Sequence, residues 1–573
     1  MGMTWRGTWT RVAILGGSAL ALAAASAEGC GGGSDTGPGT GLTAVGAHGG
    51  SGATGAQGGT GGAQGGTGGA PACTGSETQP CYEGPDGTEG VGICHAGTST
   101  CVQGQWGSCE DQQIPLVEDC NAIGDEDCNG VPCSEHLWSR MFGHSGWDEI
   151  HTVATDAAGN VAIGGVFQGT VDTGCGEVQG SNTGDGFVTL YSADTGDCLW
   201  SVHVAATESA MVTGLARDGD DNLVVTGTFD GELAVLGMTL TAGGTGDGFL
   251  LKLDSLGGLL WGTHLATSAG ATGTKTPNGV AIDAAGDIAL VGSFTGHWAC
   301  PLPMCDTVPN GNAAFVNKHS GVDGHLLWRK SYDSPGDQAA LAVAAEADGS
   351  VVVGGYFDQS LNLGITTLTA PTGWYGFLAK LTGDTGATVW GKSFGDPPTI
   401  TMNQQISAIA IAAGGDIVVT GQSRGGVTFA PGDVLQSEAS GRDVLLARYT
   451  SDGDLVWRGL YGALNNQYGT GLAVDSADNV ILVGGNDGSV DFGGGALTTA
   501  NGADVFLAKF SATGTLVWNR SFGGPGDDVA LGTAVNALDQ IALAGYASSS
   551  LDFGGGPLPY AGAHDAFVAL FYP

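Results

Sequence analysis

Three oxygen-bearing side chains near residue 127 have the types and spacing of a calcium loop. Asp125, Asp127 and Asn129 alternate along the chain, and a glycine follows them. In such a run, alternate oxygens point toward the cation and the glycine permits a sharp turn. The twelfth position is His136 rather than a bidentate Glu, and Glu135 lies one residue out of register. Two interpretations stay open, a calcium-type site or an acidic turn between cysteines, and no other cofactor is expected.

The cysteines are spaced for disulfides. Eight of the 13 fall between residues 73 and 133, where large apolar side chains are few. A segment too small for an adequate core is usually stapled by disulfides, so residues 73–136 are predicted to form a disulfide-rich module of undetermined connectivity. Cys175 with Cys198, and Cys300 with Cys305, are predicted to form local disulfides. Their spacing is not the C-x-x-C of redox sites.

Sequence patterns of catalysis are missing. The chain contains no G-x-S-x-G, H-E-x-x-H or Walker-type run, and its 11 His are scattered. We therefore assign no catalytic residue and do not expect an enzyme. The alternative is a polysaccharide hydrolase or lyase that uses acidic side chains as acid and base.

One basic column runs through the second half of the chain. It comprises five of the 17 basic residues, Lys252, Lys318, Lys380, Arg448 and Lys509. A ring of cations could hold an anion, but we expect these side chains to pair with acidic residues of neighbouring strands. An acidic column precedes DAAGN-like turns, which favour Asp and Gly for backbone reasons; its members are Asp156, Asp218, Asp283, Glu346 and Asp475.

Three further columns repeat with one period of 61 to 67 residues. The first column is Trp138, Trp200, Trp261, Trp328, Trp390, Trp457 and Trp518. The second, inside apolar strands, is Gly165, Gly227, Gly292, Gly355, Gly421, Gly485 and Gly545. The third is Phe187, Phe249, Phe315, Phe377, Leu445, Phe506 and Phe567. Each period holds about four strand-length segments and no amphipathic helix, which is typical of propeller blades.

The ends of the repeat tract predict how the ring closes. The tract begins on a tryptophan strand, 137–142, and stops just after a phenylalanine strand, 566–572. The first strand is thus predicted to complete the last blade and to leave no open edge. The fold class is all-β, a seven-bladed β-propeller over residues 137–573. We attribute the glycine column to close approach of neighbouring sheets near the axis.

The N-terminus has the layout of an export signal over residues 1–29. Arg6 and Arg11 precede an apolar run too short to span a membrane. Cleavage after Ala27 would release a secreted protein, whereas cleavage before Cys30 would leave a lipidated cysteine. Removing Cys30 leaves twelve cysteines, an even number, which favours lipidation. Residues 30–72 are almost all Gly, Ala, Thr, Ser and Gln and are predicted to be a disordered, flexible linker.

Two segments resemble known families. FGGPGDD (522–528), VDFGGG (490–495) and LDFGGG (551–556) resemble the β-propeller repeats of large bacterial surface and secreted proteins. CYEGPDGTEGVGICHAGTSTCVQGQWGSC, followed by EDCNAIGDEDCNG, resembles the Cys/Asp-rich metal-binding motif of myxobacterial cell-surface proteins, a family named after a copper-binding protein. The resemblances imply a bacterial envelope setting and, for the second segment, a metal ligand such as copper, and they transfer no catalytic residue.

Charge and location together bound the function. With 17 basic and 57 acidic residues, the net charge is −40, which excludes nucleic acid and anionic lipid surfaces as partners. The membrane is reached only through the lipid anchor. We expect a monomeric outer-membrane or cell-surface lipoprotein, or a secreted protein, that binds an extracellular protein or glycan. The expected contacts lie in the longest connections, 267–278, 295–312 and 425–442.

Overall fold

The computed structural model describes residues 73–85, 88–91, 93–115, 136–266, 273–298, 307–395, 402–437, 441–463 and 465–573. The chain divides into two compact units, Met1–Pro115 and Leu116–Pro573, and each is described by itself. Within these ranges every regular element is a β-strand, and no helix could cross a membrane. The predicted all-β class is confirmed.

The smaller unit is a three-stranded antiparallel sheet held by disulfides. Its strands, in sheet order, are β1 (Thr78–Cys81), β2 (Gly97–Val102) and β3 (Gln105–Glu110). One disulfide, Cys81–Cys109, joins the outer strands β1 and β3 to each other. The other, Cys73–Cys101, joins the segment before β1 to the central strand β2. Few apolar side chains are buried here, which is why cross-links replace a core.

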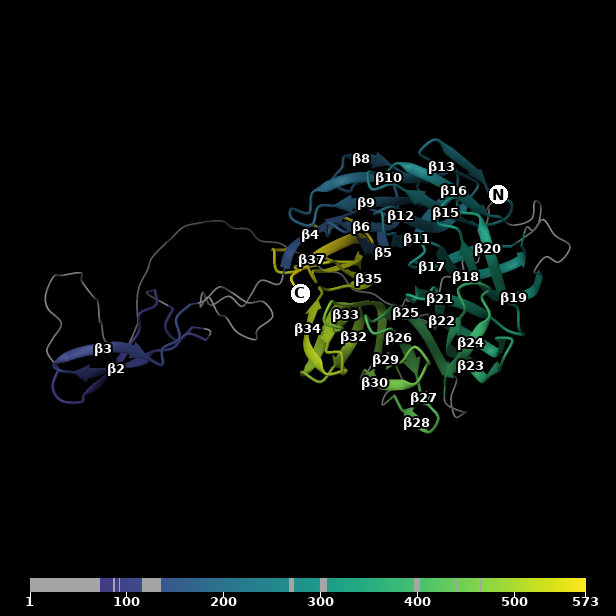
Figure 1. Cartoon of the computed structure of the whole chain (residues 1–573). Coiled ribbons are helices and arrows are strands. Elements are labelled where there is room, and N and C mark those ends of the chain that lie inside the picture. Colours follow the sequence, from purple (N-terminus) through teal and green to yellow (C-terminus); the bar gives the residue numbers. More distant parts are fainter. Residues whose placement is uncertain are drawn as a thin grey trace, which may run out of the picture. The chain divides into compact units, whose positions relative to one another are not determined.

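The larger unit is a β-propeller in which the chain forms successive groups of four antiparallel strands (Figure 1). A hairpin extends the first group to a six-stranded sheet, and a short parallel pairing merges the fourth and fifth groups into one eight-stranded sheet. The first three sheets are β5 (Glu149–Thr155), β6 (Val161–Phe167), β9 (Asp185–Tyr191) and β10 (Cys198–Ala206); β11 (Ser209–Arg217), β12 (Leu223–Asp230), β15 (Asp247–Leu253) and β16 (Leu259–Leu265); β17 (Lys275–Ile282), β18 (Ile288–His297), β19 (Thr307–His319) and β20 (Leu326–Tyr332). The next two are β21 (Gln338–Ala345), β22 (Val351–Asn362), β23 (Thr367–Leu381) and β24 (Thr388–Phe394); β25 (Met402–Ile411), β26 (Ile417–Arg424), β29 (Asp443–Tyr449) and β30 (Leu455–Tyr461). The last two are β31 (Asn465–Val474), β32 (Val480–Asp491), β33 (Ala496–Phe510) and β34 (Leu516–Phe522); β35 (Val529–Val535), β36 (Ile541–Ala547), β37 (Asp565–Phe571) and β4 (His136–Phe142). Short hairpins extend some second-to-third connections: β7 (Thr170–Asp172) with β8 (Glu177–Gln179), β13 (Glu232–Val235) with β14 (Met238–Thr241), and β27 (Val427–Ala430) with β28 (Asp433–Leu435).

The sheets follow one another around an axis. The first strand of each sheet contacts the first strand of the next, and β35 of the last sheet contacts β5 of the first. In the last sheet, β37 pairs with β4, with Ala566 opposite Phe142 and Leu570 opposite Trp138. The N-terminal strand of the tract thus completes the last sheet, as predicted.

The glycine column has a different cause from the one we expected. In every first strand a β-bulge turns one carbonyl toward the second strand; a Cβ on Gly165 would lie 1.9 Å from the Glu149 carbonyl oxygen, and one on Gly545 would lie 2.0 Å from that of Val529. The close approach lies inside each sheet, not between sheets. In the sixth sheet the residue that meets this carbonyl is Gly484, so our alignment on Gly485 was off by one.

Six of the seven tryptophans, all but Trp518, lock their sheet to the next. The indole ring covers the glycine of the turn between the third and fourth strands of the following sheet; a Cβ on Gly514, for example, would lie 2.7 Å from Trp457. The indole nitrogens of five tryptophans also donate to carbonyls of these turns, at 2.9 to 3.1 Å: Trp138, Trp200, Trp328, Trp390 and Trp457. The turn glycines have φ near +60 to +90°, a conformation that other residues rarely adopt.

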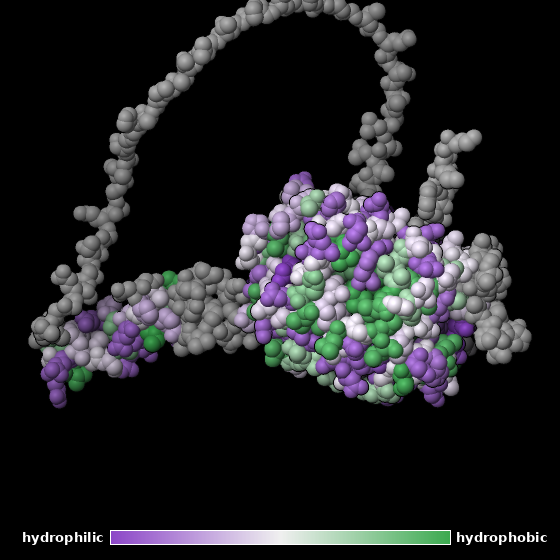
Figure 2. Space-filling view, turned by 90° about the horizontal axis from the view of Figure 1, so that it is seen from above, coloured by the Kyte–Doolittle hydropathy of each residue, from purple (hydrophilic) through white to green (hydrophobic). Residues whose placement is uncertain are grey.

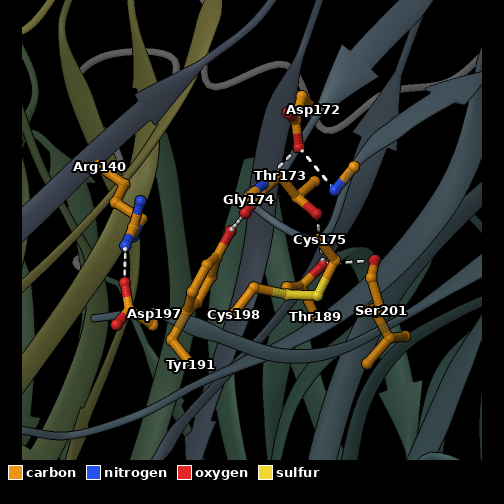
Figure 3. The surroundings of a disulfide bond; sticks show 12 residues. Arg140, Asp172, Thr173, Gly174, Cys175, Thr189, Tyr191, Asp197, Cys198 and Ser201 are labelled. Atoms are coloured by element: carbon orange, nitrogen blue, oxygen red, sulfur yellow. Dashed lines mark hydrogen bonds and ion pairs between the residues drawn. A yellow bond between two sulfur atoms is a disulfide. The ribbon is translucent and has the colours of Figure 1, made fainter. Parts of the chain in front are cut away.

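A disulfide fixes one second-to-third connection. Cys175, between β7 and β8, is bonded to Cys198 at the start of β10. Figure 3 shows the surroundings: Tyr191 donates to the Thr173 carbonyl at 2.6 Å, and Asp172 accepts the Gly174 amide at 2.8 Å. The β7–β8 connection is therefore held by one covalent and several polar contacts.

Substituting Gly514 by Ala tests the tryptophan lock. We expect a loss of about 2–3 kcal/mol in the free energy of unfolding, because the added Cβ is strained at φ +82° and overlaps Trp457. Gly364→Ala is the matched control, since its φ is +89° but no atom lies within 4 Å of the added Cβ; it should cost about 1 kcal/mol. Equal losses in chemical denaturation would show that the indole contact adds nothing.

Candidate functional site

The antiparallel topology separates the connections into two ends. The short turns between first and second strands, and between third and fourth strands, lie at one end, here named the turn end. The second-to-third connections and the links to the next sheet lie at the other, named the loop end. The three longest connections were predicted at 267–278, 295–312 and 425–442. Their described residues lie at the loop end.

Ion pairs occupy the turn end. The basic column pairs with the acids of the acidic column or of nearby turns: Lys252 with Asp218 at 2.7 Å, Lys318 with Asp283 at 2.6 Å, Lys380 with Glu346, Arg448 with Asp416 at 2.8 Å, and Lys509 with Asp475 at 3.1 Å. The basic members are nine-tenths buried or more. The expected structural role of this column is confirmed, and its charges are not free to hold an anion.

A hollow of about 620 Å³ opens at the turn end between the third and fourth sheets. Its polar lining includes Lys318, Asp283 and Asp348. Lys318 is bound to Asp283, and Asp348 accepts the Ser350 amide at 2.8 Å. Both contacts are internal to the fold.

Paired carboxyl groups lie at the loop end, where adjacent sheets meet. Burial and the charge of Asp528 raise the pKa of Asp504 to about 6, and the Asp504 Oδ1 atom is buried without a hydrogen-bond partner. Asp148 and Asp565 repeat the arrangement one sheet later, because a Cβ on Gly143 would meet both carboxylates. Burial, opposed by two backbone N–H bonds, raises the pKa of Asp148 to about 6.

Beside this second pair, Glu149 lies between two histidines. The carboxylate of Glu149 is 3.0 Å from His564 Nδ1 and 3.1 Å from His151 Nε2. Glu149 is 7% exposed. The two imidazoles come from opposite ends of the repeat tract, and they meet because β35 and β37 lie beside β5 and β4.

An aromatic stack continues from His564. The Trp147 ring lies 4.5 Å from the His564 ring, and the Tyr546 ring lies 4.3 Å from it on nearly parallel planes, 11° apart. Trp147 is 38% exposed and Tyr546 is 3% exposed, so the stack runs from the surface into the interior. Burial and the charges near it, those of Tyr468, Glu149 and Asp527 among them, raise the pKa of Tyr546.

The arrangement can hold charge and position a proton. Glu149 accepts from both rings only if each contacting nitrogen bears hydrogen. His151 Nδ1 also lies 3.3 Å from the Val212 carbonyl oxygen, which connects this cluster to the first strand of the second sheet. Among the described residues, no three His, Cys, Asp or Glu side chains converge as metal ligands.

The predicted site residues lie elsewhere or outside the described ranges. Asp125, Asp127, Asn129, Cys30, Cys300 and Cys305 fall outside the described residues. Cys175 and Cys198 form a disulfide at the rim of the first sheet. Sequence reasoning missed Glu149, His564 and Tyr546. Glu149 and His564 are 415 positions apart, and only the predicted closure of the ring could have brought them together.

Apolar side chains are exposed around the outer edge of the propeller. The residue before each of six tryptophans is 45 to 51% exposed: Leu199, Leu260, Leu327, Val389, Val456 and Val517. Side chains alternate across a strand, so a buried tryptophan turns its neighbour outward. Figure 2 shows apolar surface interspersed with hydrophilic side chains on the side that it draws.

Replacing Asp504 with Asn tests the carboxyl pairing. A folded-state pKa near 6, above the unfolded value of 3.8, means that the folded form loses stability as pH rises from about 4 to 7. At pH 8 the free energy of unfolding of Asp504→Asn should therefore exceed that of the parent by about 1 kcal/mol, a figure reduced for screening of the charge by solvent. At pH 4 the two free energies should be equal. Asp452→Asn, at an exposed turn-end site, should change neither. A difference independent of pH would contradict the assignment.

Known proteins share only limited similarity with this chain. No protein-family model matches the chain. An uncharacterized WD repeat-containing protein of Acanthamoeba polyphaga mimivirus is 23% identical over 197 residues, which span 29% of this chain and 14% of that protein. BamB from Moraxella catarrhalis is 12% identical with a TM-score of 0.36, over 76% of this chain and 99% of BamB. The Neurospora crassa Pan2 WD40 domain is 8% identical with a TM-score of 0.38, over 76% of this chain and 97% of that domain.

Proposed function

We propose that the chain is a lipid-anchored binding scaffold of the cell envelope, in which a seven-bladed β-propeller contacts an extracellular protein or glycan with its loop end. The observation that carries the proposal is the contrast between the two ends. At the turn end the side chains of the basic column form ion pairs with acidic residues of the same chain. The loop end combines the longest connections with an exposed tryptophan and a cluster of ionisable groups. A binding face on a rigid frame is the typical use of such loops.

The excess of acidic side chains restricts the kinds of partner that the propeller can bind. From residue 136 onward the chain has 15 basic and 43 acidic side chains. This surface repels nucleic acid, anionic lipids and polyuronates, which supports a neutral or basic partner. The same repulsion argues against a lyase that acts on acidic polysaccharide. A hydrolase acting on neutral glycan is the second candidate, favoured by the Glu149–His564 pair as acid and base.

The anchor and its linker complete the proposal. Cys30 would bear the lipid, and residues 30–72 would tether the folded part with a reach of about 35 Å. Three described disulfides suit an oxidising compartment outside the cytoplasm. The metal-binding alternative belongs to Asp125, Asp127 and Asn129, with calcium as the ligand that the loop spacing favours, or copper as the ligand that the family resemblance implies.

Cys30→Ala tests the anchor. In a bacterial host fed labelled palmitate, the parent chain should incorporate label and enter the detergent phase, and the variant should do neither, because the thioether site is gone. Mass spectrometry of the mature parent should give a lipidated Cys30 as its first residue. A parent that begins at Glu28 without lipid would show ordinary secretion instead.

Exchanging the 425–442 connection for a short Gly-containing turn tests the binding face. We expect binding on protein and glycan arrays to fall to background, because the loop end supplies the contacts. A second exchange of the turn-end segment 413–415, which lies outside the tryptophan contacts, should leave binding intact. Array binding that survives exchange of 425–442 and, separately, of 295–312 would contradict this function, and release of sugar from a bound glycan would favour the hydrolase.

A further inference from the structure

Two arginines at the loop end differ from most basic side chains of the propeller. Eight other Lys and Arg side chains form ion pairs with carboxylates. The guanidinium groups of Arg424, at the end of β26, and Arg442, just before β29, form neither an ion pair nor a hydrogen bond with any described residue. From residue 136 onward acids outnumber bases by 43 to 15, so two neighbouring arginines without an acid partner need an explanation.

Strand pairing brings the two arginines together. Ser423 of β26 lies opposite Asp443 of β29, so the next pair along the same ladder sets Arg424 against Arg442. Side chains directly opposite each other on antiparallel strands project from the same face, with Cβ atoms about 4.5–5.5 Å apart. Burial and the charge of Arg424 lower the pKa of Arg442, which agrees with this placement. Two like charges are therefore held side by side.

Amide side chains border the arginine pair on both sides. Asn403 of β25 lies opposite Arg424 in the fifth sheet. Asn466 of β31, in the sixth sheet, forms a backbone bridge with Arg442. Gln422, two residues before Arg424 and thus on the same face, is 6% exposed, and its Oε1 atom is buried without a hydrogen-bond partner. The row therefore combines two unpaired guanidinium groups with polar amides at the junction of two sheets.

Two carboxylates that border this row in the strand order are engaged elsewhere. Asp443 follows Arg442 directly, so its side chain projects from the opposite face, where a Cβ on Gly462 would lie 2.2 Å from its Oδ1 atom. Asp487 lies opposite Asn466 and accepts a hydrogen bond from that side chain. Neither of these acids neutralises the two arginines, so the row keeps its positive charge.

The pair is accessible from solvent. Arg424 is exposed and Arg442 is half-buried. The 425–442 connection begins directly after Arg424 and ends at Arg442, so the arginines lie at the base of a connection that we propose as part of the binding face. A guanidinium group is planar and presents its N–H donors in a fork that fits the two oxygens of a carboxylate. Two such forks side by side can hold one carboxylate between them.

We propose that Arg424 and Arg442 together bind one carboxylate group of a partner protein. A carboxylate offsets the repulsion between the two guanidinium groups and accepts hydrogen bonds from both. The acid excess of the surrounding surface repels a polyanion, so the ligand is an isolated carboxylate. Tyr468, whose phenol acts on Arg442, is 5% exposed and leaves no open ring on which a sugar could stack, which favours a protein over a sugar acid. This inference rests on the proposed binding function and names the chemistry of its site.

The test is calorimetric titration of the full chain with two carboxylates, the α-amide of N-acetyl-glutamic acid and N-acetyl-glycine. The uncharged α-amide of N-acetyl-glutamine is the ligand control. Both carboxylates should bind and the control should not, with affinity falling as salt rises. Tighter binding of the glutamic acid derivative indicates an acidic side chain of the partner, and tighter binding of N-acetyl-glycine indicates its chain terminus; either result supports the site. Glucuronate that binds more tightly than both would overturn the assignment to a protein partner.

Variants separate the site from the overall charge. Arg424→Gln combined with Arg442→Gln should weaken carboxylate binding at least tenfold, and each single change should weaken it several-fold because one fork remains. Thermal unfolding verifies the fold, and Arg424→Gln, at an exposed side chain, carries the test alone where the double variant does not fold. Lys330→Gln is the matched control, since this half-buried lysine of β20 also forms no ion pair among the described residues; it should leave affinity unchanged. Equal losses in the site and control variants, or equal binding of the glutamine derivative, would overturn the inference.

The array partner distinguishes this inference from the proposed function. If a partner that depends on the loop end still binds the Arg424→Gln, Arg442→Gln variant as tightly as the parent, the carboxylate site is wrong and the binding scaffold stands. If no array partner depends on the loop end while the two carboxylates bind through these arginines, the scaffold function is wrong and the carboxylate site stands.

Discussion

The contact between a tryptophan and the turn glycine of the next sheet is the interaction on which this propeller depends. At six of the seven junctions the indole covers a backbone that has no Cβ, and where its nitrogen donates to the same turn the contact combines burial with a hydrogen bond. The glycine is required twice, for its positive φ and for the space under the ring. Sheets that share only side-chain contacts could slide; this lock sets their spacing and angle.

One junction lacks the lock and is held differently. No turn joins β37 to β4, because these strands come from opposite ends of the tract, so Trp518 packs in the cluster of Phe553 and Phe571 instead. Nearer the axis, bulge residues join successive first strands, as Thr213 does to the Pro277 carbonyl at 2.8 Å. The junction between the last and the first sheets keeps the lock, through Trp138, but the bulge residue of its first strand is Leu531, which cannot form such a bond. There Glu149 and His564 add a polar link to those of Thr155 with the Val535 carbonyl and Asn536 with the Gly159 carbonyl, so the candidate site also helps to close the ring.

The sequence supported the repeat, the closure and the ion pairs because each depends on a residue type that recurs with one period. The lysine column could be assigned to acids since both columns were visible along the chain. The cause of the glycine column could not, because a bulge is a matter of register: Gly484 and Gly485 are adjacent, and only strand pairing tells which one meets the Tyr468 carbonyl. Glu149 and His564 belong to no column, and their meeting depends on the three-dimensional closure.

Glu149 and His564 could not be predicted because, in a repeat protein, the residues that maintain the fold recur with the period and those of a functional site need not. The position after the bulge glycine is Val166 in the first sheet, Thr228 in the second and Tyr546 in the last, although the strand pairing around it is the same. The fold requires only that the side chain at this position fits between the neighbouring strands, so the residue can vary without destabilising the propeller. Chemistry accumulates where the period is broken. At the junction of the two chain ends the basic column breaks, because Leu570 and Leu190 stand where other sheets have a lysine or arginine. A search of repeat sequences for function should therefore begin with the departures from the period, placed on the closed ring.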